Sequence, residues 1–145
     1  MNKAIYGSVL AVILSSSIPV TAQPYPDMVG LWAGTVRVVS SGNIERDRLD
    51  RGGIVISEVN LELRITVQDG ETFVGRTRSF NQNDEESSIY VWGSIRSTGD
   101  EALFITEIGG RGHIWFEDAD EFEYCLTNLN DEVLTSYCAR LHKIE

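Results

Sequence analysis

In this chain of 145 residues, the two cysteines, Cys125 and Cys138, are the residues whose chemistry is easiest to predict from the sequence. A zinc site would need more ligands than these two residues and the two histidines, His113 and His142, can supply at their spacing. A redox pair would be expected to show Cys-x-x-Cys, which the sequence lacks. We therefore expect a structural disulfide between Cys125 and Cys138, provided that the chain reaches an oxidising compartment.

The two histidines offer little support for catalysis. General acid–base chemistry needs a histidine held by a third group beside a nucleophile. No Gly-x-Ser-x-Gly or His-Glu-x-x-His pattern places such a group near His113 or His142. We interpret both as structural or surface residues, and we predict a non-enzymatic protein with no catalytic residue and no cofactor.

A run of carboxylates could bind a hard cation such as calcium. Five of them fall within seven residues: Glu117, Asp118, Asp120, Glu121 and Glu123. There is no Asp-x-Asp-x-Asp-Gly loop, and alternation along a hairpin would send these side chains to both faces. We interpret the run as a solvated acidic turn and predict no metal site.

Aromatic side chains are the best candidates for binding a ligand, because small-molecule pockets are mostly apolar with a few polar groups. The candidates are Trp32, Tyr90, Trp92, Tyr124 and Tyr137. Packing in a hydrophobic core would explain the same residues, and the sequence leaves both readings open.

The first 22 residues have the pattern of an export signal. Lys3 supplies the positive charge, residues 4–14 form a mainly apolar run, and Val20-Thr21-Ala22 places small residues before Gln23. The alternative is a membrane anchor, but the run is well short of the roughly 20 residues that span a bilayer. We therefore expect cleavage after residue 22 and one domain over residues 23–145, secreted or periplasmic, with no membrane attachment after cleavage.

The charge of the chain is strongly negative, with a formal value of −10 at pH 7. Such an anion repels nucleic acid and anionic lipid, and it attracts basic partners. We therefore predict no nucleic-acid binding.

Short runs of alternating apolar and polar residues, separated by turn signals, fill the chain after residue 28. In the clearest run, Val59, Leu61, Leu63, Ile65 and Val67 share one face. Sequential hairpins favour an all-β, antiparallel, up-and-down eight-stranded barrel over a sandwich, since closure removes exposed edges. The eight expected strands cover residues 31–40, 59–68, 73–80, 88–97, 102–108, 113–117, 121–128 and 133–142.

The last hairpin can be aligned by its cysteines. If Cys125 and Cys138 are cross-strand partners, paired positions sum to 263, which places the turn at Asp131-Glu132. One face then carries the disulfide, and the other is apolar; a slip by one residue would scramble both faces. The resulting pairs are Glu121 with His142, Phe122 with Leu141, Glu123 with Arg140, Tyr124 with Ala139, and Leu126 with Tyr137.

The start of the first strand, Gly30-Leu31-Trp32, resembles the Gly-x-Trp that opens calycin barrels, the superfamily of lipocalins, fatty-acid-binding proteins and avidins. Phe73-Val74-Gly75-Arg76, after Asp69-Gly70, is similar to the Phe-x-Gly of early calycin strands. The resemblance implies a lipocalin- or avidin-like barrel in which Trp32 closes one end. The chain departs from lipocalins in having no helix after the last strand, and no biotin-site residues can be matched.

Two functions fit these features. In the first, a small apolar ligand enters the barrel between residues 41–53 and 81–87. In the alternative, the acidic surface binds a basic protein, for example as an exported inhibitor of a basic secreted enzyme. The sequence does not settle whether the interior is filled or hollow.

Overall fold

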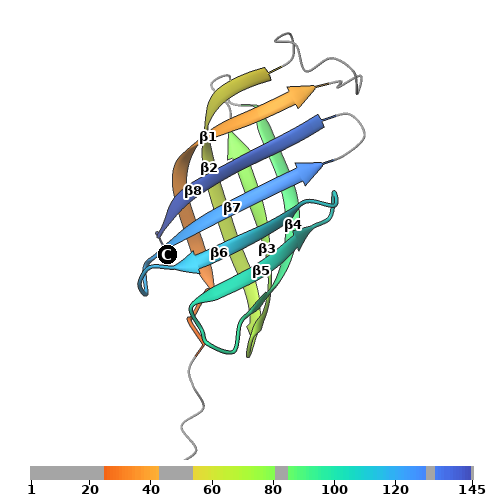
Figure 1. Cartoon of the computed structure of the whole chain (residues 1–145). Coiled ribbons are helices and arrows are strands. Elements are labelled where there is room, and N and C mark those ends of the chain that lie inside the picture. The colour runs from red at the N-terminus through yellow and green to blue at the C-terminus, as the bar shows by residue number, and fades with distance from the viewer. Residues whose placement is uncertain (1–24, 43–53, 81–84, 130–132, 145) are drawn as a thin grey trace, which may run out of the picture.

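A computed structural model describes residues 25–42, 54–80, 85–129 and 133–144. These residues form a closed antiparallel barrel in which each strand pairs with the next and the last pairs with the first (Figure 1). The predicted all-β, up-and-down, eight-stranded barrel is confirmed, and the described residues contain no helix. The strands are β1 (Gly30–Gly42), β2 (Ile54–Asp69), β3 (Thr72–Phe80), β4 (Glu86–Ile95), β5 (Glu101–Thr106), β6 (Arg111–Phe116), β7 (Glu121–Leu129) and β8 (Val133–Lys143).

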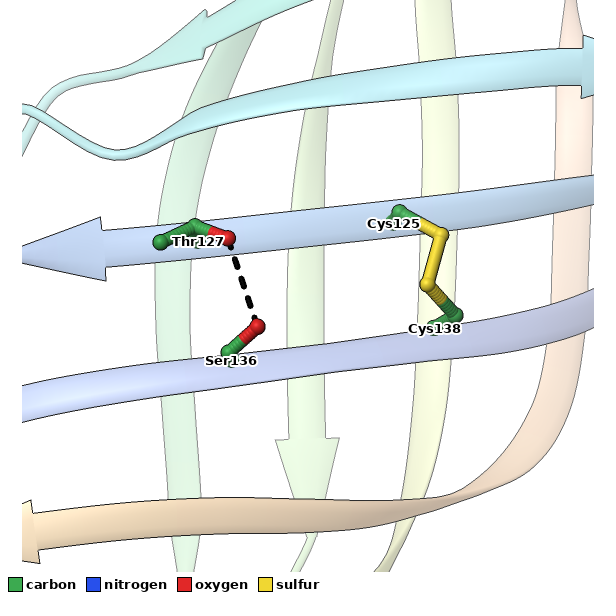
Figure 2. Close-up of a disulfide and its surroundings, with 4 residues drawn as sticks. All are labelled: Cys125, Thr127, Ser136 and Cys138. Carbon is green, nitrogen blue, oxygen red and sulfur yellow. Dashed lines mark hydrogen bonds between the residues drawn. A yellow bond between two sulfur atoms is a disulfide. The ribbon is translucent and has the colours of Figure 1, made fainter.

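The β7–β8 hairpin has the predicted register throughout. Cys125 lies directly opposite Cys138, and the five other predicted pairs are all present. The two cysteines form a disulfide on the outer face of the barrel, and the hydroxyls of Thr127 and Ser136 lie 3.3 Å apart beside it (Figure 2). The predicted turn at residues 131–132 lies outside the described residues.

Strand β2 contains one irregularity that the sequence pattern did not predict. Leu61, Leu63 and Ile65 are buried, as alternation requires. A β-bulge between Ile65 and Val67 then shifts the register against β3. The prediction that Val67 shares a face with Leu61, Leu63 and Ile65 is therefore wrong: Val67 is 56% exposed, and Gln68 is the half-buried residue.

Gln68 holds the residues that precede β1 across one end of the barrel. Its amide oxygen accepts a hydrogen bond from the backbone N–H of Met28 at 2.8 Å, and its amide nitrogen donates to the carbonyl of Pro26 at 2.9 Å. Met28 is fully buried, and its carbonyl accepts the indole N–H of Trp32 at 2.8 Å. This end of the barrel, which we call the closed end, is therefore plugged by the chain's own residues.

Aromatic rings pack against one another in the core. Trp32 and Phe122 have ring centroids 4.4 Å apart, and Phe104 stacks on Tyr124 at 4.6 Å. A Cβ built on Gly93 would lie 2.1 Å from the ring of Phe73. Glycine in β4 therefore makes room for an aromatic ring in the core.

The strands from β4 to β6 end slightly earlier than alternation suggested. Thr106 ends β5 because its carbonyl accepts a hydrogen bond from Gly109 and its hydroxyl accepts one from Gly110, which starts a turn. Gly109 has a φ of 84°, a backbone conformation that residues other than glycine rarely adopt. A turn therefore follows Thr106, and the strand boundaries differ from the expected ones by one or two residues.

Candidate functional site

A cavity of about 210 Å³ lies at the end of the barrel opposite the plug, which we call the open end. It is formed where β1, β3 and β7 end and where β2, β4 and β8 begin. Its apolar walls come from Val38, Val59, Leu61, Ile89, Ile108 and Leu126, and its polar atoms come from Ser79, Ser87, Asn128, Thr135 and Tyr137. The barrel is thus filled near one end and hollow near the other.

The strand ends around this cavity are those that residues 43–53, 81–84 and 130–132 connect. The sequence analysis placed a ligand entrance between residues 41–53 and 81–87. Ser87, from the second range, lines the cavity. Most of the predicted entrance lies outside the described residues.

Asn128 is the most buried polar side chain in the cavity wall, with 7% of its surface exposed. Its side-chain oxygen is buried and has no hydrogen-bond partner among the described residues. Buried acceptors are normally satisfied, so one without a partner calls for an explanation. It is a strong acceptor that is available to a bound molecule.

Two tyrosines lie beside Asn128 on the same hairpin. Tyr137 lines the cavity, and the fully buried Tyr124 lies below it, with ring centroids 6.2 Å apart. Burial is the main reason that the pKa of both phenols lies well above the ordinary value of 10.0, and the nearby Tyr137 adds to the effect on Tyr124. Both hydroxyls therefore stay protonated and able to donate a hydrogen bond.

No carboxylate, histidine, lysine or arginine is among the described residues that line the cavity. An ion placed there would lose its hydration without gaining a charged partner, which is costly. The wall can therefore bury an apolar body and orient it by neutral hydrogen bonds. Among the described residues of the wall, Tyr137 is the one with a titratable side chain.

The structure separates the five aromatic residues that the sequence suggested for ligand binding. Tyr137 lines the cavity and Tyr124 lies beneath it, whereas Trp32 is buried at the closed end. Tyr90 and Trp92 are 46% and 41% exposed on the outside of the barrel. They belong neither to the core nor to the cavity.

The placement of Tyr90 and Trp92 follows from the alternation in β4. Val91 points inward and is buried, so its two neighbours must point outward. Trp92 pairs with Val74 on one side and with Ile105 on the other, which gives an apolar stripe across the outer face of β3, β4 and β5. The guanidinium of Arg76 lies 5.3 Å from the ring centre of Tyr90.

Both histidines pair with a glutamate on the outer surface. Nε2 of His113 lies 2.5 Å from a carboxylate oxygen of Glu101, which also pairs with Arg96. The His113 ring stacks on Trp115 with centroids 3.9 Å apart. These contacts support the structural role expected for His113.

Glu121 pairs with the second histidine, His142, and with Arg140. Its carboxylate contacts Nδ1 of His142 at 3.2 Å and Nε of Arg140 at 3.0 Å. Arg140 lies opposite Glu123 in the register, so its ion pair with Glu121 runs diagonally across the hairpin. One of the five acidic residues expected at this turn is thus held by two basic side chains, as a surface ion pair.

One group of described residues has three candidate ligand atoms within 4.8 Å of one another: Glu123, Cys125 and Cys138. Its two sulfurs are bonded to each other, and metal binding requires a thiolate. This group therefore does not suit an ion while the disulfide is intact.

None of the described residues belongs to a helix that could span a bilayer.

Asn128 was not a candidate in the sequence analysis, although its position could have been found. It follows Tyr124 and Leu126 at spacing two along β7, so it must share their inward face. Its place in the wall of a cavity depends on the size of side chains from other strands. Alternation along β7 predicts that Asn128 points inward, but it does not predict that a cavity lies next to this side chain.

No protein-family model matches the chain, and no curated protein matches its sequence. Among solved structures, EF1p2_mFAP2b bound to DFHBI is 11% identical, with a TM-score of 0.52 over 76% of this chain and 91% of that chain. The S-type phycobiliprotein lyase CPES from Guillardia theta is 15% identical, with a TM-score of 0.45 over 81% and 89% of the two chains. A de novo designed fluorescence-activating β-barrel is 11% identical, with a TM-score of 0.43 over 76% and 91%. The likeness to the first of these shows a shared barrel fold.

Proposed function

We propose that this protein binds a small, largely apolar molecule at the open end of the barrel and catalyses no reaction. The observation that supports this most directly is the cavity of about 210 Å³, with its apolar wall and few polar atoms. EF1p2_mFAP2b, which shares the barrel fold, was solved with DFHBI bound. Burial of apolar surface would supply the affinity, at roughly 25 cal/mol per Å² removed from water before the costs of association.

We also propose that the protein works outside the cytoplasm, as a calycin-like barrel released by cleavage after residue 22. The signal pattern of residues 1–22 supports export. The disulfide between Cys125 and Cys138 fits an oxidising compartment. Amino-terminal sequencing of the protein from its own cell should give Gln23 as the first residue, and an intact Met1 would contradict the proposal.

Ligand binding can be tested in two steps. Native mass spectrometry of the protein from its own cell should show a bound small molecule. Titration with 1,4-dimethylbenzene, followed by NMR, should then shift resonances of the cavity wall to the same extent in 50 mM and 500 mM salt, because the probe is uncharged and no described residue of the wall carries a charge. Association with a basic protein that fades steeply as salt rises would favour the acidic interaction surface instead.

A matched pair of variants locates the site. Ser79 lines the cavity, so Ser79→Phe should fill it and abolish binding of 1,4-dimethylbenzene. Ser94 is exposed on β4, so Ser94→Phe adds the same ring outside the barrel and should leave binding unchanged. Equal affinity in both variants would place the ligand elsewhere and overturn the proposal.

A further inference from the structure

The polar atoms of the cavity wall are arranged in two cross-strand pairs. Asn128 lies opposite Thr135 across β7 and β8, and Ser79 lies opposite Ser87 across β3 and β4. All four side chains are neutral, and all four line the cavity. A ligand that touches these four side chains can therefore form hydrogen bonds with them but not an ion pair.

Asn128 differs from the other three because its acceptor is both buried and unpaired. The residue is 7% exposed, and its side-chain oxygen has no partner among the described residues. The buried hydroxyl of Tyr124, four residues earlier on the same face of β7, is also unpaired among the described residues, although the side chains of Tyr137 and Thr77 lie near it. A barrel that only buried apolar surface would gain nothing from keeping these two groups in its interior.

The volume limits the size of the ligand. A closed cavity of about 150 Å³ in another protein holds benzene, which has six heavy atoms. By that measure a cavity of about 210 Å³ holds a body of about eight heavy atoms. The enclosed part of the ligand is therefore compact, close to the size of a substituted benzene ring.

We propose that the cavity selects compact neutral molecules that donate an N–H or O–H hydrogen bond to the side-chain oxygen of Asn128. This inference rests on the proposed function, since it names the class of ligand for the same cavity. Charged molecules of the same size are excluded because no described wall residue carries a compensating charge. Isosteres without a donor bind more weakly because they leave the Asn128 oxygen buried and unpaired.

Three probes of nearly equal size test the proposal on the wild-type protein. They are 4-methylphenol, which has a donor, 1,4-dimethylbenzene, which has none, and benzoate, which is charged. Isothermal titration or NMR titration should rank 4-methylphenol first, by about tenfold over 1,4-dimethylbenzene, as expected for one hydrogen bond. Benzoate should not bind measurably.

The variant Asn128→Leu removes the acceptor and keeps a similar volume. It should reduce the preference for 4-methylphenol to about twofold or less. Thr127→Val, the matched control on the exposed outer face of β7, should leave the preference unchanged. A measurement that needs no variant is the side-chain NH₂ resonance of Asn128, which should shift with 4-methylphenol and much less with 1,4-dimethylbenzene.

The outcomes separate this inference from the proposed function. Equal affinity for 4-methylphenol and 1,4-dimethylbenzene would overturn the inference and leave the binding barrel standing. A preference that survives Asn128→Leu, or benzoate bound as tightly as 4-methylphenol, would also overturn the inference. Failure of every neutral probe to reach the cavity would overturn both.

Discussion

Cys125 and Cys138 lie directly opposite each other in neighbouring strands, and their bond closes the hairpin that carries Asn128 and Tyr137. Figure 2 shows the bond between the two strands, on the outer face. The two cavity residues point inward from the same strands. The disulfide therefore constrains the wall of the cavity from behind, without contributing a group to it.

Replacing both cysteines should destabilise the barrel without rearranging it. The two residues are 13 positions apart, and closing a loop of that size contributes about 3 kcal/mol in the chain-entropy model. The double variant C125S/C138S should lose about 2–4 kcal/mol in the free energy of unfolding, measured by urea denaturation. Wild-type protein unfolded in a reducing agent should match the variant, and an unchanged urea midpoint would show that the bridge adds nothing.

The contact between Gln68 and Met28 gives a second prediction, because Gln68 fastens the plug at the closed end. Gln68→Leu removes three hydrogen bonds to backbone groups, of Met28, Pro26 and Gly70, and leaves the N–H of Met28 without its partner. We expect a loss of about 1–3 kcal/mol in the free energy of unfolding. Amide hydrogen exchange at Met28 should also become faster.

Glu58→Gln is the control for Gln68→Leu, since Glu58 is an exposed residue of the same strand and lies far from the bulge. It should change the free energy of unfolding by less than about 0.5 kcal/mol. Unchanged exchange at Met28 in Gln68→Leu would mean that other contacts, such as the hydrogen bond from Trp32 to the Met28 carbonyl, hold the plug without Gln68.

The sequence predicted most of this fold because alternation and turn residues act locally. The register of β7 and β8 followed from one cysteine pair. The bulge after Ile65 could not be predicted from the sequence, because no glycine and no change in composition marks its position in β2. That one extra residue turned Val67 outward and Gln68 inward, so the plug was also missed.

The candidate site was less predictable than the fold. Tyr137 and Tyr124 were chosen correctly as inward residues, but Tyr90 and Trp92 were chosen for their aromatic rings although they alternate with buried residues. An aromatic side chain fits a strand on either face, so its type alone does not give its direction. The cavity depends on the combined volume of side chains from most of the strands, which no local pattern records.

Gly93 and Phe73 give a third prediction, since the ring occupies the space where a Cβ on Gly93 would lie. The three atoms nearest to that Cβ all belong to Phe73, at 2.1 to 2.7 Å. Gly93→Ala should therefore cost about 1–3 kcal/mol in the free energy of unfolding through overpacking. In the background of Phe73→Leu the same change should cost clearly less, because the smaller side chain can move aside.

A double-mutant cycle by urea denaturation measures this coupling between Gly93 and Phe73. Equal costs of Gly93→Ala in both backgrounds would show that the backbone of β4, and not the ring, requires glycine at this position.

The fourth prediction concerns Tyr124 and Tyr137, which should make the free energy of unfolding depend on pH in the alkaline range. Burial raises the pKa of both phenols above the ordinary value of 10.0, so the unfolded chain releases these protons at a lower pH than the folded barrel does. Below pH 10 both states hold the protons, and the two phenols give no pH dependence. As the pH rises above 10, unfolding releases protons, and the free energy of unfolding falls by up to about 1.4 kcal/mol per pH unit for each phenol. Urea denaturation between pH 9 and 11.5 should show this fall. Tyr137→Phe removes one of the two phenols, so the slope of the free energy of unfolding against pH should be smaller by the contribution of that phenol. A slope that is the same in Tyr137→Phe and in the wild type would mean that Tyr137 is hydrated in the folded barrel and that the cavity is open to water at that depth.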